Sequence, residues 1–95
     1  MRFMSRSSIV QAERIYKSLA NRRRLAILLL LSLRGRVSVS DIAAHLKISL
    51  PATSRHLRAL AGADLVESEQ TSTLVYYFLP KDKDTLLDAA LKAIR

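Results

Sequence analysis

The sequence predicts a mainly helical domain that carries one small β-hairpin. Its 95 residues include only two glycines and two prolines, and 49% are hydrophobic, which is enough for one modest core. Apolar residues recur at helical spacing over most of the chain, and the spacing shortens to two only after Asp64. This pattern predicts one domain over residues 8–95, preceded by a flexible basic segment over residues 1–7.

The first predicted helix starts at Ser8, in the stretch "SIVQAERIYKSLA". Its apolar residues recur every three to four positions, so they share one stripe of the helix surface. The stripe consists of Ile9, Ala12, Ile15, Tyr16 and Leu19.

The second predicted helix lies in "NRRRLAILLLLSLRGR", residues 21–36, where arginines flank a nearly continuous apolar run. A secretory signal or a membrane anchor has the same order of charge and apolar residues. The run is much shorter than the roughly 20 residues that cross a bilayer, and a signal peptide would begin near Met1. We therefore expect a core helix that is capped by Asn21, ends at Gly35 and is buried on all sides. This favours an unexported, cytoplasmic protein with no membrane segment.

Two short helices follow a brief extended piece at residues 37–39. Ser40 is expected to cap the first, "DIAAHLK", and Ser49 the second, "PATSRHLRALAGA". Pro51 falls in a first turn, where proline is tolerated. In the second of these helices the spacing buries Thr53, Leu57, Leu60 and Ala61, and it turns Ser54, Arg55 and Arg58 outward.

The hairpin consists of the predicted strands "LVESEQ" and "TLVYYFL", joined by a polar turn around Thr71 and Ser72. Pro80 ends the second strand. A last helix, "DKDTLLDAALKAIR", is expected to turn Leu87, Ala90, Leu91 and Ile94 inward and Asp84, Asp88, Lys92 and Arg95 outward.

Two short helices joined by a tight turn and followed by a hairpin make a winged helix-turn-helix. Reading DNA requires a helix with small or polar residues near its N-terminus and cations nearby for phosphates. The stretch "LPATSRHLR", residues 50–58, supplies both. Residues 1–63 hold twelve lysines and arginines against two acids, whereas residues 64–95 hold four against six. The basic portion is therefore expected to face a polyanion.

Three stretches resemble the ArsR/SmtB family of small bacterial and archaeal repressors. They are "LANRRRLAIL" (residues 19–28), "SLPATSRHLRALAGADLV" (residues 49–66) and "LVYYFL" (residues 74–79). The resemblance covers about residues 9–95. It implies a homodimer, built largely from the first and last helices, that binds palindromic duplex DNA and represses transcription.

The resemblance and the spacing together predict the residues of a dimer interface and of a DNA-binding surface. The expected dimer interface comprises Ile9, Ala12, Ile15, Tyr16, Leu19, Leu86, Leu87, Ala90, Leu91 and Ile94. The expected DNA-binding residues are Ser38, Ser40, Lys47, Ser49, Leu50, Pro51, Ala52, Ser54, Arg55, Arg58, Gln70, Thr71, Ser72 and Thr73.

The chain departs from the family where metals bind. The stretch "RVSVSDI", residues 36–42, has Ser38 and Ser40 where metal-sensing members have cysteines, and a hydroxyl is a poor ligand for soft or borderline metals. Residues 81–95 contain no histidine, and the chain contains no cysteine. His45 is interpreted as an ordinary surface or half-buried histidine. We expect no metal and no cofactor, and the effector stays unknown.

The DNA-reading positions depart from the family as well. Leu50 replaces a glutamine that commonly reaches bases, and residues 70–73 lack a basic wing tip. Direct readout is thus expected from Ser54 and Arg55, with Ala52 able to approach a thymine methyl group. Other residues of the basic region have two interpretations each. His56 is assigned to packing and local hydrogen bonding rather than to phosphate, and Arg24 to a structural ion pair, whereas Arg22 and Arg23 are left open between phosphate and acidic side chains such as Glu13 or Glu67.

The sequence argues against an enzyme, because it has no cysteine, no glycine-rich phosphate loop and no His–acid pair at catalytic spacing. Two alternatives to a specific regulator stay open. One is a winged helix that serves as a protein-interaction module, which does not account for the charge asymmetry. The other is non-specific chromatin-like or RNA binding, which predicts affinity without an operator preference.

Overall fold

The computed structural model describes residues 6–82 and 85–94, with side chains for residues 8–82 and 87–94. The helices are α1 (Arg6–Leu19), α2 (Arg22–Arg34), α3 (Val39–Leu46), α4 (Leu50–Gly62) and α5 (Thr85–Ile94). The strands are β1 (Val37–Ser38), β2 (Glu67–Thr71) and β3 (Leu74–Phe78). The predicted class, mainly helical with a hairpin wing, is confirmed.

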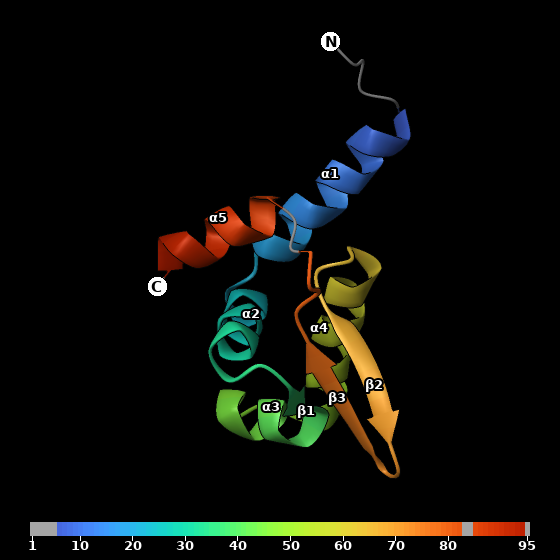
Figure 1. Cartoon of the computed structure of the whole chain (residues 1–95), viewed down its shortest axis with the longest axis vertical. Helices are drawn as coiled ribbons and strands as arrows, with labels where there is room; N and C mark the ends of the chain where they lie inside the picture. The colour runs from blue at the N-terminus through green and yellow to red at the C-terminus, as the bar shows by residue number, and fades with distance from the viewer. Residues whose placement is uncertain (1–5, 83–84, 95) are drawn as a thin grey trace.

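The helices α2, α3 and α4 form a compact group, and the hairpin β2–β3 extends beside them as a wing (Figure 1). At the opposite end from the wing tip, α1 projects outward and α5 crosses near its end (Figure 1). The molecule is therefore elongated, with extents of 46 × 28 × 23 Å. One end thus presents the helix-turn-helix and the wing, and the other end presents the two terminal helices.

Both ends of the chain differ in detail from the prediction. The helix α1 already includes Arg6, within the segment expected to be flexible, and residues 1–5 lie outside the described residues. The described part of α5 starts at Thr85, so the outward positions expected for Asp84 and Arg95 also lie outside the described residues.

The core joins all five helices to the base of the wing. Its largest fully buried side chains are Ile27, Leu28, Leu31, Ile42, Leu57, Leu60, Leu65, Leu87, Leu91 and Thr53. Each apolar side chain of this size contributes about 1.5–3 kcal/mol when it is fully buried. The expectation that α2 is buried on all sides is wrong, because Leu33 in its last turn is 69% exposed. The helices α1, α3, α4 and α5 all pack on α2, but none of them covers Leu33.

The starts and ends of the helices follow from local hydrogen bonds. The Asn21 side chain accepts from the backbone N–H groups of Arg23 and Arg24 at 3.0 and 3.1 Å, which confirms the predicted cap of α2. Gly35 ends α2 with a φ of 82°, a backbone conformation that glycine adopts at little cost.

The start of α3 corrects the prediction. Ser38, not Ser40, caps this helix, because its hydroxyl accepts from the backbone N–H of Asp41 at 3.1 Å. Val39 is consequently helical rather than extended. The capping geometry decides between two serines that sequence alone presents as equivalent.

The sheet has three strands in the order β1-β3-β2, one more than predicted. β1 pairs antiparallel with β3, with Val37 opposite Tyr77, and thereby attaches the wing to the end of α2. The β2–β3 turn lies at Ser72 and Thr73, one residue later than predicted, and Ser72 adopts a left-handed φ of 57°. The predicted strand residues Leu65 and Val66 instead enter the core before β2 begins.

Candidate nucleic-acid interface

The helix α4 has a clearly defined inner side. Thr53, Leu57 and Leu60 are fully buried, as the spacing predicts, whereas Ala61 is only partly buried. The buried Thr53 hydroxyl donates to the Ser49 carbonyl at 2.9 Å, so its polar atom is satisfied within the helix. This packing fixes the rotation of α4 and therefore determines which residues face outward.

The outer side of α4 is polar and basic. Pro51, Arg55 and Arg58 are exposed, and Ser54 is half-buried. These four residues and Leu50 line an open hollow of about 570 Å³. Within the described chain, neither arginine forms an ion pair with a carboxylate. Two guanidinium groups thus remain available to an anionic partner.

The turn that precedes α4 supplies further predicted contacts. Lys47 adopts a left-handed φ of 57°, and the Ile48 N–H donates to the Ala43 carbonyl at 3.2 Å, which closes the turn after α3. Ser49 caps α4, as predicted, by accepting from the Ala52 N–H at 3.2 Å. Lys47 and Ser49 are exposed, and Ala52 is half-buried. These residues lie at the N-terminal end of α4, next to its outer side.

The two serines at the start of α3 differ in accessibility. Ser38 is only 5% exposed, and its hydroxyl is engaged in the helix cap, so we remove it from the DNA-binding set. Ser40 is exposed and stays in that set.

The wing tip is entirely polar and exposed. Gln70, Thr71, Ser72 and Thr73 all face solvent, and the Gln70 side-chain amide donates to the Ser72 carbonyl at 3.4 Å. The tip carries no cation, so any groove contact must come from neutral donors and acceptors.

Arg36, which sequence reasoning did not single out, holds the wing in place. Its guanidinium bonds the Glu69 carboxylate on β2 at 2.7 Å and the Thr71 hydroxyl at 3.1 Å. The same group lies 4.5 Å from the centroid of the Tyr76 ring on β3. Arg36 directly precedes β1, so its side chain spans all three strands. The pairing of β1 with β3, which the sequence did not predict, brings these groups together.

His56, on the flank of α4, contacts the start of α2. The Arg24 Nε donates to the His56 Nδ1 at 3.3 Å, which agrees with the expected local hydrogen bonding of His56. Burial lowers the pKa of His56 most, and the neighbouring charges of Arg24, Arg23 and Arg55 lower it further. The ion pair predicted for Arg24 is not found among the described residues, where its side-chain partner is a ring nitrogen of His56 rather than a carboxylate. Glu13, one acidic partner considered for Arg22 and Arg23, pairs with Lys17 at 3.7 Å.

The predicted dimer residues differ in how far they are exposed. Ile9, Tyr16 and Ile94 are exposed, Ala12, Leu19 and Ala90 are partly buried, and Val10 is exposed although the prediction omitted it. Ile15, Leu87 and Leu91 are at most 6% exposed, so they fill the core of this chain and cannot contact a partner. Their assignment to the interface is wrong, because both terminal helices pack on α2 with part of their apolar side chains. The Leu86 side chain lies outside the described residues.

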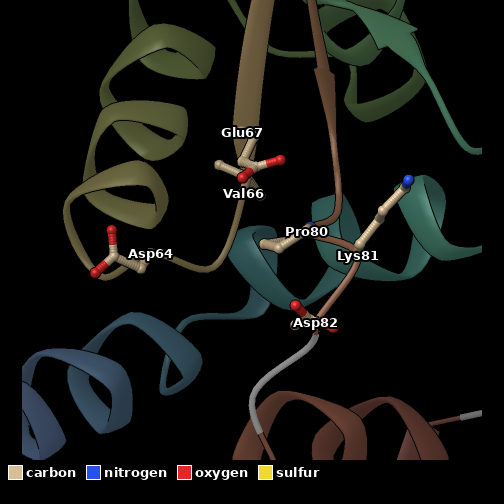
Figure 2. Close-up of a pocket in the computed structure, with 6 residues that line it drawn as sticks. All are labelled: Asp64, Val66, Glu67, Pro80, Lys81 and Asp82. Carbon is tan, nitrogen blue, oxygen red and sulfur yellow. The ribbon is translucent and has the colours of Figure 1, made fainter.

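An acidic hollow of about 480 Å³ lies at the base of the wing and is lined by Asp64, Val66, Glu67, Pro80, Lys81 and Asp82. The carboxylates come from separate segments and do not point toward one centre (Figure 2). Within the described residues no group of three histidine, cysteine or acidic side chains could hold a metal ion. Asp64 follows the C-terminal end of α4, a helix about 20 Å long. Asp64 therefore lies at the far end of α4 from Leu50.

No helix among the described residues is both long and apolar enough to cross a membrane.

The chain is similar to known proteins both in sequence and in fold. Residues 21–68 match the model of the arsR family of bacterial regulatory proteins. The arsenic resistance transcriptional regulator ArsR1 of Pseudomonas putida is 31% identical over 80 residues, which cover 84% of this chain and 62% of that protein. The chain thus spans about three-fifths of the length of this relative.

Solved structures show the same fold. HlyU from Vibrio cholerae superposes with a TM-score of 0.76 at 30% identity, over 95% of this chain and 94% of that one. A homodimeric winged helix-turn-helix DNA-binding domain from Mycobacterium bovis, from a possible ArsR-family regulator, gives a TM-score of 0.78 at 31% identity. That match covers 99% of this chain and 86% of the other.

Proposed function

The chain belongs to the arsR family of bacterial regulatory proteins, and on that basis we propose that it is a homodimeric repressor that binds an inverted repeat in duplex DNA. The observation that carries the proposal is the two-sided character of α4. Its inner side is locked in the core by Leu57 and Leu60, and its outer side presents Ser54, Arg55 and Arg58 without acidic partners in the described chain.

Each part of the outer side has a role in this proposal. Arg55 is assigned to guanine recognition, because a guanidinium group can bind the O6 and N7 atoms of that base. Ser54 and Ala52 are small enough to allow the helix to approach base edges closely. Arg58, one turn further along, binds phosphate and fixes the register of the helix. Lys47, Ser40, Ser49 and the wing tip at residues 70–73 complete the contact surface, together with Leu50 and Pro51.

Dimerisation follows from the exposed apolar residues of the terminal helices. Ile9, Tyr16 and Ile94 are exposed on α1 and α5, and a symmetric partner would bury them. The relative from Mycobacterium bovis is described as a homodimer. Two recognition helices related by a two-fold axis contact half-sites about 34–36 Å apart.

The proposal is tested by selecting bound duplexes from a random library with the purified protein and sequencing them. We expect enrichment of an inverted repeat and a dimer mass in solution by light scattering. Recovery of unenriched sequences would favour non-specific binding, and absence of any DNA binding would favour a protein-interaction module. Either result would overturn the proposal.

The proposed repressor does not use the metal control of its cysteine-bearing relatives. Ser38 is a buried cap, and the His56 Nδ1 already accepts a hydrogen bond from Arg24. To displace a bound operator, a metal must bind the DNA-free conformation of the dimer more tightly than the DNA-bound conformation, by several kcal/mol. Thiolate sites supply a difference of that size. We expect micromolar zinc, cadmium, arsenite or a thiol oxidant to leave the operator complex intact, as measured by fluorescence anisotropy. A cysteine-bearing family member serves as the positive control, and a many-fold loss of affinity that His45→Ala abolishes would contradict the expectation.

A further inference from the structure

The start of α2 carries three consecutive arginines that the contacts described above do not fully explain. Arg22, Arg23 and Arg24 occupy the first turn, which contains no acidic residue. The N-terminus of a helix is its positive end, so cations there are unfavourable. Among the described residues, Arg24 has His56 as a side-chain partner, no such partner is found for Arg22 or Arg23, and both of these are exposed.

The start of α2 contacts the flank of α4 at His56. The bond between Arg24 and His56 joins the first turn of α2 to the middle of α4. Arg23 and Arg55, which come from different helices, both act electrostatically on the His56 imidazole. Because Arg23, Arg24 and Arg55 all act on this one imidazole, the cations at the start of α2 lie near the basic residues of α4.

The combined arginine cluster lacks compensation within the described part of the chain. The ion pairs found there are Lys17–Glu13, Arg36–Glu69 and Lys92–Asp88. None involves Arg22, Arg23, Arg55 or Arg58, and none of these four has another carboxylate partner among the described residues. Like charges grouped in this way repel one another in the free protein, and a polyanion relieves that repulsion.

We propose that the start of α2 is a second DNA-contacting surface, where Arg22 and Arg23 bind backbone phosphates beside the groove that α4 enters. Arg24 is the positioning residue of this surface, because it holds the first turn of α2 against His56. The inference rests on the proposed function and adds to it. Phosphates are the same at every base pair, so this surface raises affinity without reading sequence.

The test compares the double variant Arg22→Gln/Arg23→Gln with Arg34→Gln. Arg34 is exposed on the same helix, about 18 Å from Arg22 along the axis, so Arg34→Gln is a control for the loss of one of the two charges. Anisotropy titrations over a series of salt concentrations, with the selected operator and with an unrelated duplex, give the slope of log Kd against log salt. Each phosphate contact that is lost lowers that slope by about 0.9.

We expect the double variant to bind both duplexes more weakly by the same factor and to lose about two units of salt slope. We expect Arg34→Gln to leave the slope unchanged. The double variant should also melt at a higher temperature than the parent in the absence of DNA, because it removes two cations from the positive end of a helix. That result would separate loss of binding from loss of folding.

The outcomes distinguish the inference from the proposed function. If the parent protein binds DNA and the double variant has an unchanged slope, the inference alone is wrong. A reduction of slope in Arg34→Gln half as large as that in the double variant would also overturn it, because loss of net charge alone would then explain both results. If the parent protein binds neither duplex, the proposed function fails, and the inference fails with it.

Discussion

At the scale of single residues, the two serines of the third helix differ in surroundings although they lie two positions apart. Ser38 is buried and accepts the Asp41 N–H, whereas the Ser40 side chain is exposed. Removing an N-cap hydroxyl typically lowers the free energy of unfolding by about 1 kcal/mol. We expect Ser38→Ala to show a loss of about that size in urea denaturation and Ser40→Ala to show little change. Equal losses in both variants would contradict the assignment of the cap.

His56 gives the folded protein a pH dependence. Its pKa in the folded state lies below the ordinary value of 6.5. The unfolded chain therefore binds a proton more readily, and the free energy of unfolding falls as the pH drops below 6.5 toward the folded-state pKa. Above pH 6.5 this contribution is complete. Protonation at Nδ1 also removes the acceptor that Arg24 uses.

We expect His56→Gln to show a smaller loss of stability between pH 7 and pH 5 than the parent protein, as measured by urea denaturation. His45→Gln, which alters an exposed histidine of α3, is the matched control and should retain the parent pH dependence. A pH profile of His56→Gln that superposes on that of the parent would show that His56 does not titrate differently on folding.

The two outer arginines of α4 are expected to act differently on DNA. Arg55→Ala should cost about 1–3 kcal/mol of binding free energy and relax the preference at one half-site position, because it removes a base contact. Arg58→Ala should weaken binding to all sequences alike and lower the salt slope by about one, because it removes a phosphate contact. Competition titrations with operator variants measure both effects. If neither change alters binding, the outer side of α4 does not face DNA.

At the scale of elements, the helices could be predicted from the sequence because their signals are local. The Asn21 cap, the Gly35 stop and the Ser49 cap each depend on neighbouring residues, and the structure bears them out. The inner side of α4 was also predictable, since Thr53, Leu57 and Leu60 follow helical spacing. The site residues on its outer side were located by the same spacing.

The elements that sequence could not predict depend on contacts distant in the chain. β1 has only two residues, too few for an alternating pattern, and it exists because Val37 meets Tyr77 on β3. The role of Arg36 depends on that pairing. The helix α2 has apolar residues on every side, so only the packing of its neighbours shows that Leu33 is left exposed.

At the scale of the whole molecule, the terminal helices combine a core role with a surface role. Spacing placed Ile15, Leu87 and Leu91 on the same stripes as Ile9 and Ile94, and only the fold separates them. The stripe identifies apolar residues but does not state whether this chain or a partner covers them. The expected dimer interface thus shrinks to the exposed members of those stripes and gains Val10.

This division predicts different consequences for two substitutions. Tyr16 is 58% exposed, so Tyr16→Asp should convert the dimer to a folded monomer, detected as a halved mass in sedimentation equilibrium with an unchanged circular dichroism spectrum. Leu91 is buried, and Leu91→Ala should instead lower the free energy of unfolding by about 2–5 kcal/mol. Leu74→Asp, at an exposed apolar position on the wing, is the control and should leave the mass unchanged. A dimer that persists in Tyr16→Asp would place the interface elsewhere.

The contacts of Arg36 with Glu69, Thr71 and Tyr76 affect how easily the wing bends. A two-stranded hairpin held only at its base would bend easily. Here β1 supports one edge of β3, and the Arg36 guanidinium reaches across Tyr76 to Glu69 on β2. In the proposed complex, a DNA groove of the wrong width would push on the wing tip. The supported wing would pass that load to the junction between α2 and α3. Because the Arg36–Glu69 pair is half exposed, salt screens it, and we expect the wing to bend more easily as the salt concentration rises.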